Sequence, residues 1–421
     1  MKKAGFLTSR YGAYDHREVP PEDAELTHVG PGTPCGEYFR RFWQPAAFSH
    51  EVADLPIAIR ILGEDLVLFR DRGGRAGVLE RQCPHRGTSL EFGLPSERGI
   101  RCCYHGWLFD VDGTILETPG EPPDSSLKNR LCHGAYPALE YRGLVFTYMG
   151  PPERRPPFPR LDTFELPGYR VVPGLRQVMP CNWLQIKDNS LDAVHTAFLH
   201  TRVSGQQFTA AYGVVPLLEW RETPIGAMYI GTRRVGEHVW VRICEFILPN
   251  VHQFPPNTQD AQREKRHVPP YGTHWAVPVD DTHTLNLDVR HVPDGMSREE
   301  EQRLLAMADF GQTADRPYEE RQRMPGDYDA QVAQRPIAIH ALEHLASTDR
   351  GVTMMRKLLR QAVAAVGRGE DPLGAGPGTP DVVRTYSQDT VLRVARAASE
   401  TGERNLLLKI GHDVADGQYR P

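Results

Sequence analysis

Short apolar segments separated by turn residues dominate the chain between residues 45 and 115. The segments LPIAIRILG and EDLVLFRD are rich in Val, Ile, Leu and Phe, and the turn sequences DRGG, ERG and DVDG stand between such segments. Runs of this length with turn residues between them are typical of antiparallel strands. The pattern therefore predicts a small β-domain in this part of the chain.

A proline-rich stretch interrupts the pattern at residues 150–174. Its sequence, GPPERRPPFPRLDTFELPGYRVVPG, contains seven prolines. This density suits an extended connector and excludes a regular helix. We place a domain boundary there.

Alternating segments return after the connector. AMYIGTRRV, HVWVRICEFIL and THTLNLDVRHV have the period of strands in an antiparallel sheet, whereas VTMMRKLLRQAVAAV has helical apolar spacing. The stretches 254–273 and 294–327 are polar and interrupted by prolines, and we expect both to be long loops. The second domain is therefore expected to be α+β.

Length and composition agree with two globular domains. The chain has 421 residues, more than the roughly 250–300 at which a single core stops growing. It is 40% hydrophobic, and no run of eighteen apolar residues or apolar leader suggests a membrane span or export, so we expect a cytoplasmic protein. A net charge of -5 with interspersed signs indicates small-molecule or protein partners rather than nucleic acid or membrane.

Two cysteine–histidine pairs form the first group of candidate ligands. Cys83-x-His85 is followed, after sixteen residues, by Cys102-x-x-His105. Zinc sites usually separate the two cysteines from the two histidines, whereas each segment here supplies one of each. In a Rieske [2Fe-2S] cluster two thiolates bind one iron and two imidazoles bind the other. The pattern favours such a cluster over a zinc site or two unrelated polar loops.

The sequence CPHRG followed by CCYHGW resembles the Rieske domain of the Rieske non-heme iron oxygenases. Rieske proteins of respiratory complexes carry an extra cysteine pair, and Thr88 and Tyr104 stand at those positions here, which favours the oxygenase type. Cys103 replaces a proline usual in the family, and we expect it to be a small buried residue. Trp107 is expected to cover the cluster.

The second group of candidate ligands lies in CNWLQIKDNSLDAVHTAFLH, residues 181–200. An amphipathic helix with hydrogen-bonded histidines is the ordinary explanation, but two histidines among several acids favour metal. His195 and His200 lie about 140° apart on an ideal helix, so the helix must end or deform between them, for example through a π-bulge. Asp192 and His195 share one face and can hydrogen-bond.

The oxygenase family has a matching motif, and the resemblance assigns roles to it. The motif residues present here are Asn182, Trp183, Asp188, Asn189, Asp192, His195 and His200. The resemblance implies that His195 and His200 bind a mononuclear Fe(II), and that Asp192, with Asn189 beside it, is catalytic. It further implies that Asp192 connects His195 to the Rieske ligand His105 of a neighbouring subunit. A homotrimer or a hexamer follows from that arrangement.

A third iron ligand must come from a distant segment. The candidates are Asp327 and Asp329, followed by Asp280, Asp281 and Asp349. Asp280 and Asp281 fit a turn between strands, and Asp349 fits the first turn of a helix. The resemblance to phthalate-type oxygenases places the ligand at Asp327, with Gln331 and Glu343-His344-Leu345 in register, although Gly326 replaces the usual acidic neighbour. Asp329 stays the alternative, and we assign no role to His133, His252, His340 or His344.

The resemblance covers nearly the whole chain and implies its organisation. Residues 1–42 would pack on the catalytic domain, residues 43–150 would form the all-β Rieske domain, residues 151–174 the connector, and residues 175–421 an antiparallel-sheet, helix-grip-like catalytic domain that holds the mononuclear iron.

The implied function is the terminal oxygenase component of a multicomponent system. It would use O2 to hydroxylate an aromatic substrate, expected to be polar or carboxylated. No flavin- or nicotinamide-binding glycine motif was found, so an NAD(P)H-dependent reductase, with or without a ferredoxin, is expected to supply electrons. A monooxygenase or O-demethylase is the alternative. A Rieske electron carrier needs only about 100 residues and would have no use for Asp192, His195 and His200, and a zinc-stabilised binding module is a further alternative.

Overall fold

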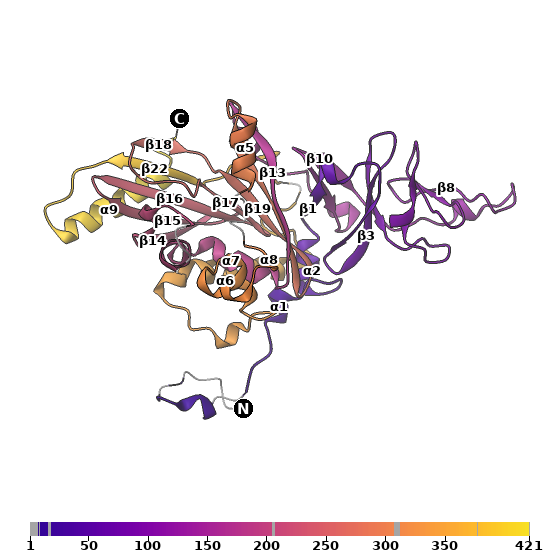
Figure 1. Cartoon of the computed structure of the whole chain (residues 1–421). Coiled ribbons are helices and arrows are strands. Elements are labelled where there is room, and N and C mark those ends of the chain that lie inside the picture. Colours follow the sequence, from indigo (N-terminus) through magenta and orange to yellow (C-terminus); the bar gives the residue numbers. More distant parts are fainter. Residues whose placement is uncertain are drawn as a thin grey trace.

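The N-terminal domain consists of short antiparallel strands, as the sequence pattern predicts. A computed structural model describes residues 7, 9–15, 18–203, 207–306, 312–376 and 378–420. Figure 1 shows the strand-rich domain extending from one side of a larger domain that contains a broad sheet and helices. The small domain has three sheets, in the strand orders β1 (Trp43–Phe48), β11 (Leu144–Tyr148), β10 (Ala138–Tyr141); β2 (Ile57–Ile61), β3 (Glu64–Arg70), β4 (Ala76–Glu80), β9 (Ala135–Tyr136); and β5 (Leu94–Pro95), β6 (Ile100–Arg101), β7 (Leu108–Phe109), β8 (Ile115–Glu117).

The segment before the small domain lies against the larger domain. Helices α1 (Ala24–Thr27) and α2 (Pro34–Phe39) both contact α8 (Arg350–Gly367). The indole Nε1 of Trp183 donates to the carbonyl of Leu26 at 3.0 Å. Because Trp183 begins α3 (Trp183–Asp188), this bond connects the N-terminal segment to the helix that precedes the histidine motif.

The proline-rich connector contains no α-helix and joins the larger domain through two strands. β12 (Arg160–Leu161) pairs in parallel with β21 (Val382–Val383), which lies near the C-terminus. β13 (Tyr169–Met179) begins inside the connector and pairs along its length with β20 (His283–Pro293). The end of the connector is therefore already part of the large sheet.

The large sheet is antiparallel and has nine strands. Its central path runs β13, β20, β19 (Gly272–Asp280), β17 (Val251–Phe254), β16 (His238–Ile247), β15 (Gly226–Val235) and β14 (Leu217–Thr223), while β22 (Gln388–Arg393) pairs with β16 and with β18 (Lys265–Val268). The three segments that alternate in the sequence correspond to β15, β16 and β20. The structure therefore confirms the α+β prediction and these strands.

Helices cover both faces of this sheet. Ala227 and Tyr229 of β15 pack in one core with Leu359 of α8. Met228 and Ile230, which point to the other face, pack in a separate core with residues of α9 (Glu400–Ala415). α8 therefore lies on the same side of the sheet as the histidine motif, and α9 lies on the opposite side.

One expected loop contains helices. The stretch 294–327 includes α5 (Arg298–Ala306) and α6 (Tyr318–Arg323), and α7 (Asp327–Val332) begins at its end. α5 and α6 are mostly charged, so they have no apolar stripe that a hydrophobicity pattern could detect. The stretch 254–273 likewise contains the short strand β18. None of the helices in the described residues is long and apolar enough to cross a membrane.

The two glycines of α8 provide a matched test of this packing. A Cβ on Gly351 would lie 2.3 Å from Trp220 Nε1 and 2.6 Å from the carbonyl of Leu191, whereas a Cβ on Gly367 would meet nothing within 4 Å. We expect Gly351→Ala to destabilise the protein by about 1–3 kcal/mol because α8 must move away from Trp220. Gly367→Ala is expected to be neutral or stabilising by up to about 1 kcal/mol. Thermal unfolding of both variants measures the difference, and equal melting temperatures would contradict the packing.

Candidate metal centres and the adjoining cavity

The two cysteine–histidine segments form loops with the same backbone hydrogen bonds. The amide of Cys83 donates to the carbonyl of Thr88 at 2.9 Å, and the amide of Cys102 donates to the carbonyl of Trp107 at 2.8 Å, five residues on in both loops. The amides of Gly87 and Gly106, four residues on, donate back to the cysteine carbonyls. Both glycines have a positive φ, 77° and 74°, which other residues rarely adopt. The two loops therefore have the same backbone structure.

The side chains of these loops converge at the end of the small domain. Cys83 and Cys102 are 3% exposed, and the imidazole rings of His85 and His105 lie 4.5 Å apart. Burial and the adjacent Cys102 thiol raise the pKa of Cys83 to about 11, so the thiolate form requires a cation such as a metal. Two buried thiols beside two more accessible imidazoles fit the donor set of a Rieske cluster.

Two neighbours of this donor set were also predicted. The indole of Trp107 stacks on His85 with ring centroids 4.9 Å apart and an interplanar angle of 3°, so Trp107 covers this side of the site as expected. The prediction for Cys103 was wrong, because its side chain is exposed. Cys103 lies at the outer turn of its loop, where only the backbone takes part in the loop hydrogen bonds, and a small side chain there has no core to enter.

A change of helix type brings the two histidines of the second motif together. α4 (Val194–Phe198) ends directly after the turn that contains His195, and residues Leu199–Val203 form a π-helix that contains His200. The rings of His195 and His200 have centroids 5.3 Å apart. The predicted helix irregularity between the two histidines is therefore confirmed, in the form of a π-helical turn.

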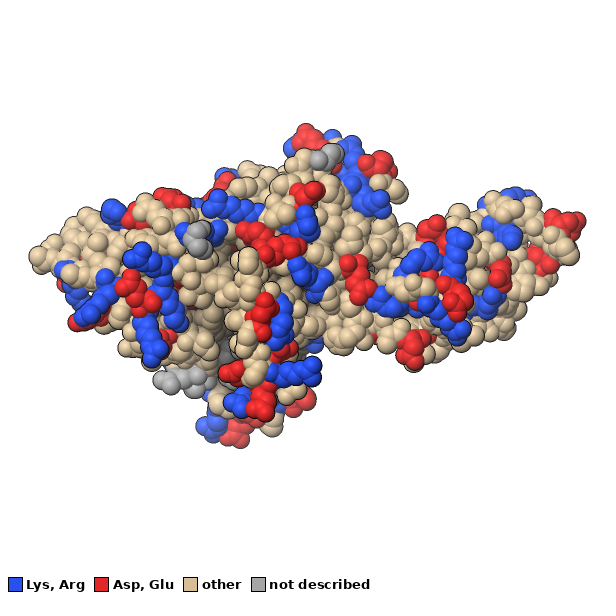
Figure 2. Space-filling model, turned by 90° about the horizontal axis from the view of Figure 1, so that it is seen from above, with Lys and Arg blue, Asp and Glu red and all other residues tan. Residues whose placement is uncertain are grey.

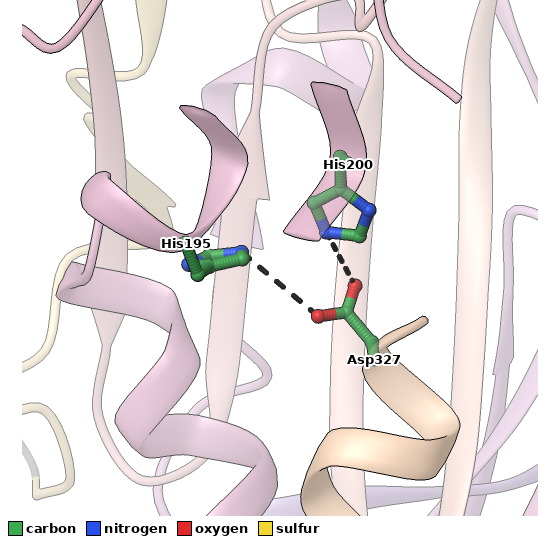
Figure 3. Close-up of side chains that lie close together, drawn as sticks. All are labelled: His195, His200 and Asp327. Atoms are coloured by element: carbon green, nitrogen blue, oxygen red, sulfur yellow. Dashed lines mark ion pairs between the residues drawn. The ribbon is translucent and has the colours of Figure 1, made fainter. Parts of the chain in front are cut away.

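Asp327, the first residue of α7, completes a cluster of three possible ligands. Its Oδ2 atom lies 3.1 Å from His200 Nε2, and its Oδ1 atom lies 3.9 Å from His195 Nε2 (Figure 3). One donor atom from each side chain lies within 4.8 Å of the others. Burial opposes ionisation of Asp327, but the two imidazoles and a hydrogen bond from Asn189 outweigh it, so the pKa of Asp327 is lowered. Two imidazoles and a carboxylate on one face can hold Fe(II) with positions left open.

The other acidic candidates are used elsewhere. Asp329 accepts hydrogen bonds from Arg316 and Arg321 at 2.5 and 2.6 Å, and Asp281 accepts from the amide of Val29. Asp280 ends β19 beside His283, and Asp349 bonds the amide of Ala346 at the start of α8. None of these four carboxylates joins the cluster around His195 and His200.

Each of the three possible ligands has an outer hydrogen-bond partner. Asp192 Oδ2 lies 3.2 Å from His195 Nδ1, as the spacing predicts, and Asn189 Nδ2 donates to Asp327 Oδ1 at 2.9 Å. Gln207 Oε1 lies 2.7 Å from His200 Nδ1. Such partners fix the tautomer and orientation of ligands. Sequence reasoning missed Gln207, since a single glutamine in a loop carries no pattern.

The remaining motif residues anchor the segment rather than face the cluster. Asn182 caps α3 and donates to the carbonyls of Thr27 and Asp281. Asp188 accepts a two-pronged hydrogen bond from Arg356, which also binds Glu343. These contacts hold α3 against the N-terminal segment and α8, and so fix the position of the histidines that follow.

A cavity of about 200 Å³ lies between this cluster and the large sheet. His195, His200 and Asp327 form one wall, and Phe208, whose ring stacks on His200 at 4.3 Å, stands beside them. The sheet side carries polar residues from β16, β17, β19 and β20, namely Arg242, His252, His274, Asn286, Asp288 and Arg290. Figure 1 places α7 in the large domain, remote from β8 and the cysteine–histidine loops, so the two centres occupy different domains.

Comparisons with known proteins agree with this geometry. The Rieske [2Fe-2S] domain family matches residues 42–137. The chain is 46% identical to the tert-butanol monooxygenase / tert-amyl alcohol desaturase oxygenase subunit of Aquincola tertiaricarbonis, over 97% of this chain and 91% of that protein. It is 37% identical to the phenoxybenzoate dioxygenase subunit alpha of Ectopseudomonas oleovorans, over 86% and 89%. A structure of NdmA from Pseudomonas putida with caffeine shares the fold, with a TM-score of 0.61 at 20% identity over 79% and 93% of the two chains.

Substitution of the neighbouring aspartates distinguishes metal binding from structural support. We expect Asp327→Ala to lower the iron content from about three to about two atoms per chain, with the visible spectrum of a Rieske cluster retained, because one of three ligands to a single iron is lost. Asp329→Ala is expected to keep all the iron and to lower the melting temperature, since Arg316 and Arg321 lose their shared partner. Iron analysis and visible absorption of both variants provide the measurement. Full iron content in Asp327→Ala would reject its role as a ligand.

Proposed function

The chain belongs to the Rieske non-heme iron oxygenases as an oxygenase subunit, and from that premise we propose which of its residues hold the metals and what they do. Its cofactors are a Rieske [2Fe-2S] cluster and a mononuclear non-heme iron. We assign Cys83 and Cys102 to one iron of the cluster and His85 and His105 to the other. The convergence of buried thiols and imidazoles on two equivalent loops supports this assignment.

We assign the mononuclear iron to His195, His200 and Asp327. When bound there, the iron supplies the site at which O2 is reduced and oxygen is transferred to the substrate. The observation that carries this proposal is the meeting of these three side chains at one wall of a cavity. Asp192, Gln207 and Asn189 would orient one ligand each, so that the ligands keep their positions when the substrate enters.

We propose that electrons pass between subunits, from the cluster of one chain to the mononuclear iron of another. The cysteine–histidine loops belong to the small domain, and the mononuclear site lies in the other domain. We propose that His105 of a second copy approaches Asp192, which holds His195 Nδ1. A homotrimer, alone or paired as a hexamer, would place three such junctions in one assembly. The electrons would come from a separate NAD(P)H-dependent reductase, with or without a ferredoxin.

The proposed reaction is O2-dependent hydroxylation of a small aromatic substrate that is polar or carboxylated. The polar sheet side of the cavity and the aromatic ring of Phe208 support this class. The relative from Aquincola tertiaricarbonis is named for tertiary alcohols and the one from Ectopseudomonas oleovorans for phenoxybenzoate. Monooxygenation or O-demethylation is the second candidate, since the same three metal ligands serve each reaction. A cytoplasmic location stays a prediction from the sequence.

Oxygen labelling tests the reaction class. We expect the iron-loaded protein, supplied with a generic reductase and labelled O2, to form an oxygenated product from a panel of aromatic acids, aryl ethers and tertiary alcohols. Mass spectrometry that finds two labelled atoms indicates dihydroxylation, whereas one labelled atom indicates monooxygenation. A reduced cluster that reoxidises in air without labelling any product would argue against an oxygenase acting on this panel.

Replacement of Asp192 tests the route between the centres. We expect Asp192→Asn to lower product formation in a single turnover by about 10- to 100-fold, because the amide does not hold His195 as the carboxylate does. The spectrum of the reduced cluster and the iron content should be unchanged. Asp416→Asn makes the same chemical change at an exposed ion pair with Arg221 and is expected to behave as the wild type. Normal single-turnover yield in Asp192→Asn would exclude this route.

A further inference from the structure

Three ionisable residues form a row across the sheet side of the cavity. His252 of β17 stands opposite His274 of β19, and His274 stands opposite Asp288 of β20. All three side chains line the cavity. Directly opposed residues on neighbouring strands have their Cβ atoms about 5 Å apart, so the row is a continuous polar floor that faces the mononuclear site.

A buried lysine lies behind this floor. Lys187 of α3 is fully buried, and its Nζ atom lies 2.8 Å from Nδ1 and 3.2 Å from the carbonyl oxygen of His274. No carboxylate of the described residues lies within ion-pair distance of Lys187. Burial lowers its pKa well below the usual value, although Asp288 opposes the shift. A protonated Lys187 is therefore a buried positive charge with hydrogen bonds but no negatively charged partner. An anion bound in the cavity could supply that negative charge.

The other cations around the floor are already compensated. Arg242 pairs with Asp389 at 3.3 Å and also donates to the carbonyls of Pro255 and Pro256. Arg290 pairs with Asp288 at 2.8 Å. These two ion pairs contribute no net charge to the floor. Protonation of Lys187 would therefore give the floor one positive charge that no carboxylate balances.

Burial and the nearby positive charges lower the pKa values of the two histidines of the floor. Burial, followed by Lys187 and Arg242, lowers the pKa of His252, and burial, followed by Lys187 and His252, lowers the pKa of His274. The Nε2 atom of His252 is buried and has no hydrogen-bond partner among the described residues. Buried polar atoms without a partner are few in native structures, and His252 is one of the residues that line the cavity.

Resting on the proposed function, we propose that His252 and His274, with Lys187 behind them, form a subsite for a carboxylate group of the substrate. Lys187 acts through His274 and is a specificity-determining positioning residue. The carboxylate accepts hydrogen bonds from the two imidazoles, and its negative charge makes protonation of the Lys187–His274 pair favourable. One proton is then taken up from solvent for each carboxylate bound, and no bond is broken. A neutral alcohol offers no charge and takes up no proton.

The groups that could share this proton come from every element around the floor. They are Lys187 on α3, Asp192 before α4, His195 on α4, His200 on the π-helix, Tyr229 on β15, Arg242 and Cys244 on β16, His252 on β17, His274 on β19, Asp288 and Arg290 on β20, and Asp327 and Tyr328 on α7. Asp288 is held by Arg290 and by the amide of Leu175. Only the Lys187–His274 pair and His252 combine a lowered pKa with no carboxylate partner in the described structure.

Benzoate and benzyl alcohol test the subsite, because they share one ring and differ in charge. Calorimetric titrations of the iron-loaded, oxidised protein in two buffers of different ionisation enthalpy give both affinity and proton uptake. We expect benzoate to bind at least about tenfold more tightly than benzyl alcohol, with close to one proton taken up for benzoate and none for the alcohol. The affinity for benzoate should fall as the pH rises.

Lys187→Met removes the charge and keeps the length of the side chain. We expect it to weaken benzoate binding by about 10- to 100-fold, to abolish proton uptake, and to leave benzyl alcohol within about threefold of the wild type. Lys409→Met removes an exposed lysine of α9 and should retain the wild-type preference. If Lys187→Met loses its Rieske spectrum through misfolding, His252→Gln is measured in its place, with the same expected loss of preference.

Three results would overturn the subsite. They are equal binding of the two probes by the wild type, benzoate binding without proton uptake, and a Lys187→Met variant that keeps the preference for benzoate. Product formation with labelled O2 is measured on the same preparation. A protein that oxygenates an alcohol but does not prefer benzoate rejects the subsite alone, whereas a protein that oxygenates nothing on the panel also challenges the proposed function.

Discussion

The mononuclear site depends on one docking contact, in which the side chain of Gln185 connects α3 to the end of α7 and to the chain that follows it. Gln185 Nε2 donates to the carbonyls of Gln331 and Arg335 at 2.9 and 3.0 Å, and its Oε1 accepts from the amide of Ala338 at 2.8 Å. The amide is 2% exposed and uses both its donor hydrogens and its oxygen in these bonds. Because the histidines follow α3 and Asp327 begins α7, this contact sets the distance between ligand residues that lie far apart in the sequence. Without the carboxylate, the two histidines would provide only two of the three protein ligands of such an iron site.

Local spacing was sufficient to predict the parts of the site that lie in one segment. A separation of five positions, from His195 to His200, is incompatible with a shared metal on a regular helix, and the π-helical turn resolves that conflict. Asp327 was harder to choose, because Asp329 offers the same chemistry two residues later. Residues two positions apart on a helix do not face the same way, and Asp329 turns to Arg316 and Arg321. Only the packing of α7 decides between them, and the sequence does not contain that information in a local form.

The contact between His252 and His274 could not be predicted from the sequence either, because it also depends on how distant segments pack together. His252 and His274 are single polar residues in alternating strands, where a histidine usually satisfies an ordinary hydrogen bond, and neither was assigned a role. Their common position emerges only from the register of β17 with β19. The helices α5 and α6 were missed because most of their residues are charged, so that hydrophobic periodicity does not reveal them. Of the strands of the large sheet, β15, β16 and β20 were predicted from the sequence, although nearly all of their residues are buried and none of the three has alternately buried and exposed positions.

Lys187 and Asp188 are neighbours on α3, but the structure compensates their charges differently. Asp188 points toward α8, where Arg356 binds both of its oxygens. Lys187 points toward the sheet, where its hydrogen bonds within the described part of the chain go to His274. An apolar side chain at Lys187 would avoid the cost of burying a cation, so a cavity that served only to enclose an apolar ring would have no physical reason to keep it. The cavity instead has a metal-binding wall on one side and, on the other, a floor that gains a positive charge when a carboxylate binds. A substrate anchored by its carboxylate at the floor presents the carbon at its other end to the metal, and the floor, rather than the metal ligands, then selects the position of oxygenation.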